Sequence, residues 1–321
     1  MHKHLDQPYL SFLENIKFKP IFILGSARSG TTILYKLLAN TSCFNHLNAY
    51  HVVNYDRILF DYINHSQDKS HQDLNDLYAD MGVKDRNFDH VSVDSNMPKE
   101  YRSIWQNQEN LSPLQVVQEV LSKCLFKGRD LGQAICKAYQ LDQENISTFI
   151  EACKKIQFIG DSRKQILLKN PWDFSNFIYI KERFPDAKFI FIHRHPLNIL
   201  NSQLRVTQST LGAKSNYLTI HSKLYSNLFR GSIIRVILSN LFVSPQLAEM
   251  RQALLTKIIA SEENFFVENI SKLQQTDYIN VKYEDLCRQP NQIIADLLHF
   301  VGVCPSLNVD YSQLIQPRHL E

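Results

Sequence analysis

The sequence predicts an α/β fold with a mainly parallel central sheet and helices on both faces. Short, wholly apolar segments that are typical of buried strands, 21–24 (IFIL) and 189–192 (FIFI), are each followed by a helical pattern. The chain of 321 residues is 44% apolar, which is enough to bury a large core. Strands that alternate with helices form such sheets, and ligands then bind beyond the carboxyl ends of the strands.

The other elements continue this alternation. In chain order, the sequence predicts strands over 21–24, 166–168, 189–192 and 278–282, and helices over 33–38, 173–183, 196–204, 245–270 and 290–301. Pro196 fits the first turn of its helix, and a further helix is predicted to begin at Ser112 and Pro113. No repeat or low-complexity linker divides the chain. We therefore predict a single domain over 1–321, in which the less regular, histidine-rich segment 46–160 is an insertion that covers the site.

The net charge, the spacing of the cysteines and the lack of long apolar segments exclude several classes of function. The net charge is only +3, and Lys and Arg are mixed with nearly as many Asp and Glu, so no nucleic-acid footprint is evident. The six cysteines contain no C-x-x-C motif, and no apolar signal segment begins the chain. The apolar stretch 233–243 is too short to cross a bilayer. We expect a cytoplasmic protein without a nucleic-acid or membrane partner, and the oligomeric state stays open.

The segment GSARSGTT (25–32), directly after the first strand, has the form of a phosphate-binding loop. A nucleoside-triphosphate loop carries a lysine before its hydroxyl residue, and here Thr31 takes the place of that lysine. Gly25 and Gly30 allow the backbone to turn its amides toward an anion, while Arg28 adds a positive charge. The loop therefore predicts an anion site that does not bind a magnesium triphosphate.

Two more polar groups follow predicted strands. Arg194 lies where the chain leaves the strand 189–192, and Ser202 lies about two turns along the next helix, so both could hold one phosphate. Lys169 ends the strand 166–168 and could neutralise charge on a leaving oxygen. Taken singly, these residues are better explained as a surface arginine, an ordinary helix serine and a solvated loop lysine.

Three blocks of sequence, in this order, resemble the sulfotransferases that use 3′-phosphoadenosine 5′-phosphosulfate (PAPS) as donor. The blocks are PIFILGSARSGTT, LLKNPWDFSNFIYIKERFPDAKFIFIHRHPLNILNS and VKYEDLCRQPNQIIADLLHFVGV, and they span 20–303. The resemblance implies the P-loop-like sulfotransferase architecture, with PAPS as co-substrate and no metal. It implies that Arg28, Ser29, Gly30, Thr31 and Thr32 hold the 5′-phosphosulfate, that Arg194 and Ser202 hold the 3′-phosphate, and that Tyr283 flanks the adenine.

The chain departs from this family at the position of the catalytic base. Many relatives place a glutamate about two dozen residues after the loop begins, yet no Glu occurs between Glu14 and Glu100. His51 is our first candidate, because an unperturbed imidazole has a pKa near neutrality. Asp56 is the second candidate and His46 the third. Arg28 and Lys169 complete the predicted catalytic group, and His195 replaces an aspartate that relatives often carry beside the arginine.

The resulting expectation is a sulfotransferase that sulfates a hydroxyl or amine of a small metabolite. The first alternative is a degenerate protein that binds the phosphoadenosine nucleotide without transferring sulfate. The second is a nucleotide kinase, which would want a lysine at position 31 and a carboxylate for magnesium. The histidines lack H-E-x-x-H spacing, so we expect no metal site.

Overall fold

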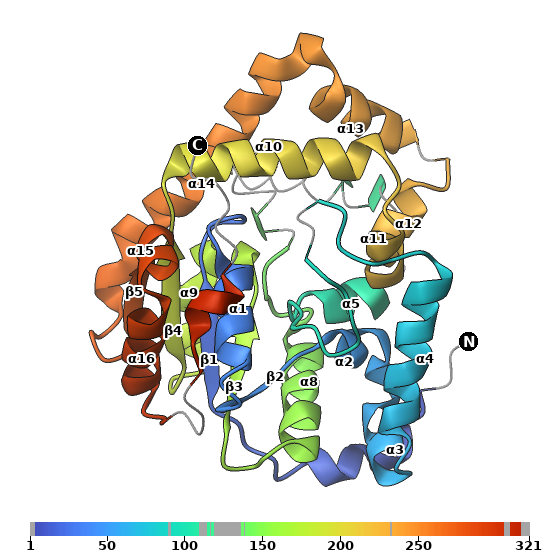
Figure 1. Ribbon diagram of the computed structural model, residues 1–321, viewed down its shortest axis with the longest axis vertical. Coiled ribbons are helices and arrows are strands. Elements are labelled where there is room, and N and C mark those ends of the chain that lie inside the picture. The colour runs from blue at the N-terminus through green and yellow to red at the C-terminus, as the bar shows by residue number, and fades with distance from the viewer. Residues whose placement is uncertain are drawn as a thin grey trace.

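The sheet contains five strands in the order β2-β3-β1-β4-β5 (Figure 1). All of its strand pairs are parallel, which confirms the mainly parallel sheet predicted from the sequence. The computed structural model describes residues 4–88, 91–108, 114–115, 117–118, 136–137, 139–231, 233–304 and 309–315. The strands are β1 (Pro20–Leu24), β2 (Phe44–His46), β3 (Gln165–Lys169), β4 (Lys188–His193) and β5 (Tyr278–Lys282). Because all strands run the same way, their carboxyl ends form one edge.

Helices make up most of the remaining structure. The α-helices are α1 (Thr31–Ala39), α2 (Ala49–Val53), α3 (Ile58–Ile63), α4 (Gln67–Asp80), α5 (Ser103–Gln108), α8 (Ile146–Ile159), α9 (Phe177–Arg183), α10 (Pro196–Gly212), α11 (Asn216–His221), α12 (Lys223–Leu228), α13 (Ile233–Val243), α14 (Ala248–Asn269), α15 (Tyr283–Arg288) and α16 (Pro290–Val301). The 3-10 helices are η1 (Gln7–Leu13), η2 (Tyr55–Arg57), η3 (Pro171–Asn176), η4 (Pro245–Leu247), η5 (Ile270–Lys272) and η6 (Tyr311–Leu314).

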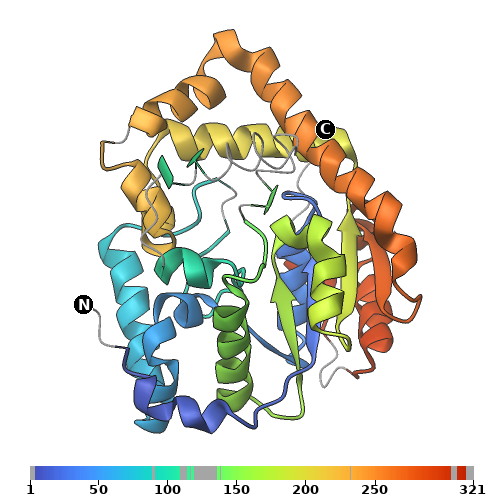
Figure 2. The same cartoon turned by 180° about the vertical axis from the view of Figure 1, so that it is seen from behind.

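The strands β1, β3 and β4 are buried on both faces of the sheet, which explains why their sequences are apolar runs. In β1, Ile21 and Ile23 pack on one side against α1 and α16, whereas Phe22 and Leu24 pack on the other side against α8, η3 and α9. All four side chains are fully buried. Figures 1 and 2 show the two helical layers from opposite sides. This packing fixes the position of β1 in the sheet, and therefore the position of the loop that follows its carboxyl end.

The four predicted strands are confirmed, and the sequence analysis missed only β2 among the strands of the described residues. β2 has three residues and includes the polar Asn45 and His46, so it shows neither an apolar run nor an alternation. It pairs with β3 over Phe44–Gln165 to His46–Leu167. Asn45 is nonetheless buried, since its side chain hydrogen bonds to the backbone of Asp161.

One helix prediction is wrong at its start. The segment predicted as a helix over 173–183 begins as the 3-10 helix η3 at Pro171, and the α-helix α9 starts only at Phe177. Ser175 lies between them with non-helical dihedral angles of −95° and 28°. The buried Phe174 and Phe177 still point into the core as expected. The helix predicted to begin at Ser112 and Pro113 lies outside the described residues.

The segment 46–160 contributes α2 to α5 and α8, which lie beside the β2 edge of the sheet (Figure 1). A buried cation ties this region to the start of the chain. The Lys155 ammonium is 2.9 Å from both Asp6 and Glu151, and it donates to the carbonyl of Tyr55. The division into one domain with an insertion stays a prediction.

Above the sheet edge, α10, α13 and α14 form the apex in Figures 1 and 2. No single helix in the described part of the chain is long and apolar enough to cross a membrane. One pair of helical segments, Ile233–Val243 and Pro245–Lys272, meets the length and composition criteria together, but it is bent by 71°.

Candidate active site

The loop between β1 and α1 has an unusual backbone. Arg28 has a φ of 78°, a left-handed conformation that few residues other than glycine adopt, and Gly30 has a φ of 110°. A Cβ atom on Gly25 would lie 2.3 Å from the carbonyl oxygen of Ile192. Glycine is therefore required at position 25 by close packing on β4 and at position 30 by the turn itself.

The turn aims the start of α1 at the sheet edge. Gly30 caps α1 without a side chain, so the first amides of the helix have no side-chain cap. The hydroxyl of Ser29 is buried and has no hydrogen-bond partner within the described residues. Free amides, a helix dipole and an unsatisfied buried hydroxyl together suit an anion.

Three contacts from the β4–α10 segment hold the strained loop. Arg194 Nη1 donates to the carbonyl oxygen of Arg28 over 3.2 Å, and Arg28 Nε donates to Ser202 Oγ over 3.1 Å. Gln203 Nε2 donates to the carbonyl oxygen of Ala27 over 2.9 Å. The structure thus brings together the two predicted anion groups, which lie 166 residues apart in sequence.

Arg194 and Ser202 contact the loop directly instead of forming a separate cradle. The Arg28 guanidinium contacts Ser202, the residue that was expected to bind the 3′-phosphate. Arg194 keeps binding capacity, because its Nε is buried without a hydrogen-bond partner among the described residues. Gln203, next to Ser202 in sequence, was missed as a residue that holds the loop.

Tyr283 closes the loop from the side of β5. It is the first residue of α15, and its ring lies so close to Gly30 that an added Cβ there would be 2.3 Å from the ring carbon Cδ2. The Arg194 guanidinium lies 4.4 Å from the ring centroid, in a cation–π contact. Tyr283 is therefore packed between the glycine of the loop and the arginine, and only part of it faces the cavity.

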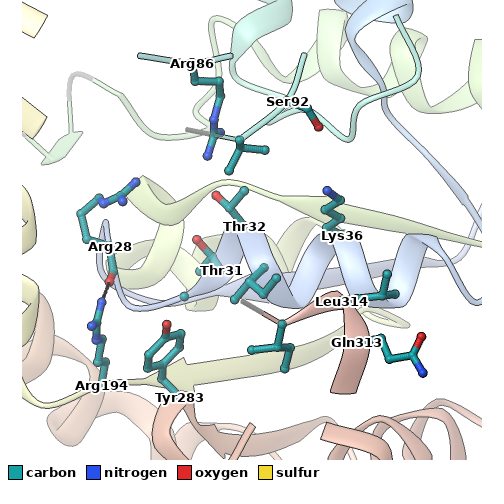
Figure 3. Close-up of a pocket in the computed structure, with 14 residues that line it drawn as sticks. Arg28, Thr31, Thr32, Lys36, Arg86, Ser92, Arg194, Tyr283, Gln313 and Leu314 are labelled. Carbon is teal, nitrogen blue, oxygen red and sulfur yellow. Dashed lines mark hydrogen bonds between the residues drawn. The ribbon is translucent and has the colours of Figure 1, made fainter. Parts of the chain in front are cut away.

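A cavity of about 440 Å³ extends from Arg28 and Arg194 along α1, as Figure 3 shows. Its lining residues are Arg28, Gly30, Thr31, Thr32, Ile33, Lys36, Arg86, Val91, Ser92, Arg194, Tyr283, Gln313, Leu314 and Ile315. In Figure 3, Arg86 and Ser92 face Thr31 and Thr32 across the cavity. Among the described lining residues four are cationic and none is acidic, so the cavity suits a polyanion of nucleotide size.

Lys169 lies at the end of β3 and is 2% exposed. Its ammonium donates to Thr32 Oγ1 over 3.3 Å and to Glu100 Oε1 over 2.5 Å. Burial raises the pKa of the Glu100 carboxyl, but the charge and hydrogen bond of Lys169 outweigh burial and lower it to about 2. Burial lowers the pKa of Lys169, and Glu100 opposes that shift. The pair is ionised and lies beside the hydroxyl of the loop.

Sequence reasoning missed Glu100, because no motif surrounds it. The segment before it reaches the sheet through one isolated bridge, Asn48 to Pro98, and through the Lys99 amide, which donates to the carbonyl of Leu47. These contacts bring Glu100 to the carboxyl edge next to β3. The only available signal was that Glu100 is the first glutamate after the loop.

His51, the first candidate base, is buried in α2 and serves as half of a capping box. Its Nδ1 accepts from the Asn48 amide over 3.2 Å, and its own amide donates to Asn48 Oδ1. An accepting Nδ1 places the ring proton on Nε2, so neither nitrogen is free to take a proton. Burial, together with the nearby His46 and His71, lowers the pKa of His51 to about 3. Its role as base stays a prediction.

The two other candidates lie in different surroundings. Asp56 is 3.6 Å from His4 Nε2 in a half-exposed ion pair, and it belongs to η2 beside the start of the chain. His46 ends β2, where its ring packs edge-on against Tyr35 and burial lowers its pKa. The Lys169 ammonium, by contrast, donates to Thr32 and to Glu100.

Residues 20–232 match the Sulfotransferase family. This chain belongs to that family. The matched range contains the loop, Lys169, Arg194 and Ser202, whereas Tyr283 and the cavity residues 313–315 lie beyond it. A comparison with curated proteins gives no significant match.

Solved structures of sulfotransferases share the fold. Sulfotransferase STF1 from Mycobacterium tuberculosis H37Rv superposes with a TM-score of 0.52 at 16% identity, over 96% of this chain and 73% of that one. Sulfotransferase STF9 from Mycobacterium avium gives a TM-score of 0.60 at 15% identity, over 93% of this chain and 67% of that one. At such identities the likeness concerns the fold.

A buried acid lies behind the loop of this sulfotransferase-family chain. Glu262 of α14 is 2% exposed, and its Oε1 accepts from Cys136 Sγ over 3.6 Å. Burial raises the pKa of Glu262 to about 8, although contacts with Ser26 and Cys136 oppose the shift. Glu262 therefore stays protonated at neutral pH, directly beneath the first serine of the loop. Nothing in its sequence neighbourhood indicated this.

We expect Gly30→Ala to abolish anion binding and to lower the free energy of unfolding by about 1–3 kcal/mol, since it combines a strained φ with a clash against Tyr283. The matched control is Gly82→Ala, where φ is 66° and nothing lies within 4 Å of the added Cβ. Titration calorimetry with 3′-phosphoadenosine 5′-phosphate and urea unfolding measure both effects. Equal binding by the two variants would contradict the assigned loop geometry.

We expect Glu262→Gln to change how stability depends on pH. A carboxyl whose pKa is about 8 in the folded state and near 4.5 when unfolded makes the protein less stable as pH rises between these values. Relative to wild type, the variant should gain up to about 1.4 kcal/mol per pH unit in this window. Urea unfolding at several pH values measures it, with the exposed Glu268→Gln as control. Parallel curves for wild type and Glu262→Gln would refute the prediction.

Proposed function

We propose that this chain transfers a sulfuryl group from PAPS to a hydroxyl or amine of a small acceptor. The single observation that carries the proposal is the contact between Arg194 and the Arg28 carbonyl at one end of a cavity that four cationic side chains line. A donor with two separate anionic groups needs cations along one continuous cavity, and needs neither a P-loop lysine nor magnesium. Membership of the sulfotransferase family supports the same reaction.

The residues of the cavity fit such a donor. The loop amides, Ser29, Thr31 and Thr32 would hold the phosphosulfate at the start of α1. Arg194 and Ser202 would hold the 3′-phosphate, after the Arg28 side chain turns from Ser202 to the anion. Tyr283 would lie against the adenine, next to Gly30. The donor supplies the sulfuryl group and leaves as 3′-phosphoadenosine 5′-phosphate.

For the proton we propose Glu100 in place of His51. Its carboxylate lies against Lys169, which in turn contacts Thr32 of the loop. When donor charge draws the Lys169 ammonium away, Glu100 keeps the burial that raises its pKa and loses the main contact that lowers it. Glu100 then becomes a stronger base as the donor binds, and it can accept the proton of the attacking hydroxyl or amine.

The second candidate function is nucleotide binding without transfer, and the same ion pair favours it. A carboxylate held at a pKa of about 2 is a weak base, so a permanent Glu100–Lys169 pair would leave the site without a proton acceptor. Such a protein would bind 3′-phosphoadenosine 5′-phosphate and yield no sulfated product. A mass-spectrometric screen of acceptors with PAPS, which detects the added mass of SO3, separates the two functions.

We expect Arg194→Ala and Lys169→Ala to have different kinetic effects. Loss of Arg194 should weaken binding of 3′-phosphoadenosine 5′-phosphate by about 10- to 100-fold, because a charge-assisted contact is removed. Loss of Lys169 should lower kcat by on the order of 100-fold, since it acts on the leaving group. Calorimetry and PAPS turnover, with the acceptor from the screen or with water, measure these values. Small and equal effects of both changes would overturn the site assignment.

We expect Glu100→Gln to lower kcat about 100-fold or more while binding of 3′-phosphoadenosine 5′-phosphate is kept, because the amide cannot accept the proton. His51→Gln is the matched comparison, since glutamine at this position of a capping box preserves the cap. If His51→Gln abolishes turnover and Glu100→Gln does not, His51 is the base.

A further inference from the structure

The outward face of α13 is apolar. Ile233, Val236, Ile237 and Val243 are 75%, 53%, 60% and 40% exposed, and with Asn240 they form a stripe at helical spacing. A surface helix normally places polar residues on this side. Single exposed apolar residues need no explanation, but a continuous stripe marks an interaction surface.

The stripe is not a consequence of a helix that lacks packing. The opposite face of α13 lies against α10 and α14, and Phe242 packs with the cluster formed by Ile199, Leu200 and Ile258. Val243 also approaches Gly212 at the end of α10. Figures 1 and 2 place α13 at the apex, on the outer side of α10. The apolar stripe therefore faces away from the body of the protein.

The segment of the chain that carries the stripe has charged residues of one sign only. No Asp or Glu occurs in 187–248, the part of the chain that contains α10 to α13. The cations of this segment are Lys188, Arg194, Arg205, Lys214, Lys223, Arg230 and Arg235. Arg205, Lys214, Lys223 and Arg230 are exposed. An apolar helix face among exposed cations combines the two attractions that hold a helix in the interface of an anionic membrane.

We propose that α13 docks this protein onto an anionic lipid surface. The stripe enters the boundary of headgroups and acyl chains, and the cations of α10 to α12 contact the headgroups. A second copy of the chain fits this surface less well, because it would bring two sets of like charges together. With only 11 residues, α13 is too short to cross the bilayer, so it would lie in the plane of the interface. This proposal revises the expectation that no membrane partner exists, and it does not depend on the nature of the donor.

The test is co-sedimentation of the full chain, without nucleotide, with vesicles of phosphatidylcholine and with vesicles of phosphatidylcholine and phosphatidylglycerol mixed about two to one. We expect binding to the mixed vesicles, little binding to phosphatidylcholine alone, and weaker binding as salt is raised. Ile233→Ser and Ile237→Ser should each weaken binding to the mixed vesicles about tenfold.

Val267→Ser is the matched control, because Val267 is 71% exposed but lies at the far end of α14. It should bind vesicles like wild type, and circular dichroism should show that all three variants are folded. Equal binding by wild type and the Ile variants would overturn the proposal. So would light scattering that shows a dimer which Ile237→Ser dissociates, because the stripe would then be an interface between copies. Nucleotide binding is measured separately, so failure of the donor proposal would not mimic either result.

Discussion

The hydrogen bond from Arg194 to the carbonyl oxygen of Arg28 is the constraint on which the site depends. The loop turns through a left-handed arginine, a conformation that costs free energy unless surrounding contacts fix it. Gln203 fixes the preceding carbonyl, so β4 and α10 together hold the turn open. With the turn fixed, α1 points its free amides at the sheet edge. Anion binding thus depends on residues far away in sequence.

Two charged regions lie at the carboxyl edge of the sheet, the cationic lining of the cavity and the ion pair of Lys169 with Glu100. Among the described residues that line the cavity the charged side chains are all cationic, whereas the Lys169 ammonium is paired with Glu100. Thr32 connects these regions, because Lys169 donates to its hydroxyl. Any anion placed at the start of α1 competes with Glu100 for Lys169. Binding at one region and basicity at the other are therefore coupled through a single ammonium group.

The sequence predicted those parts of the fold that depend on residues adjacent in the chain. Three of the four predicted strands could be recognised as apolar segments and the fourth, β5, by its alternation of apolar and polar residues. The loop could be recognised because its glycines and hydroxyls are contiguous. β2 was invisible because its polar Asn45 is satisfied by Asp161, which is distant in sequence. Glu100 and Glu262 were missed for the same physical reason. Their importance comes from burial and from partners on other elements, and neither can be read from neighbouring residues.

Helix α10 connects the two functional surfaces. Its Ser202 and Gln203 contact the loop, and on its outer side it carries α13 with the exposed apolar stripe. A lipid surface bound at α13 would lie one helix away from the anion loop and would fix the orientation of the cavity relative to the membrane. Phe242 of α13 packs against the cluster that contains Ile199 and Leu200 of α10, so α13 rests on the helix whose Ser202 contacts Arg28. The same helix, α10, would then support both the membrane-binding helix α13 and the anion-binding loop.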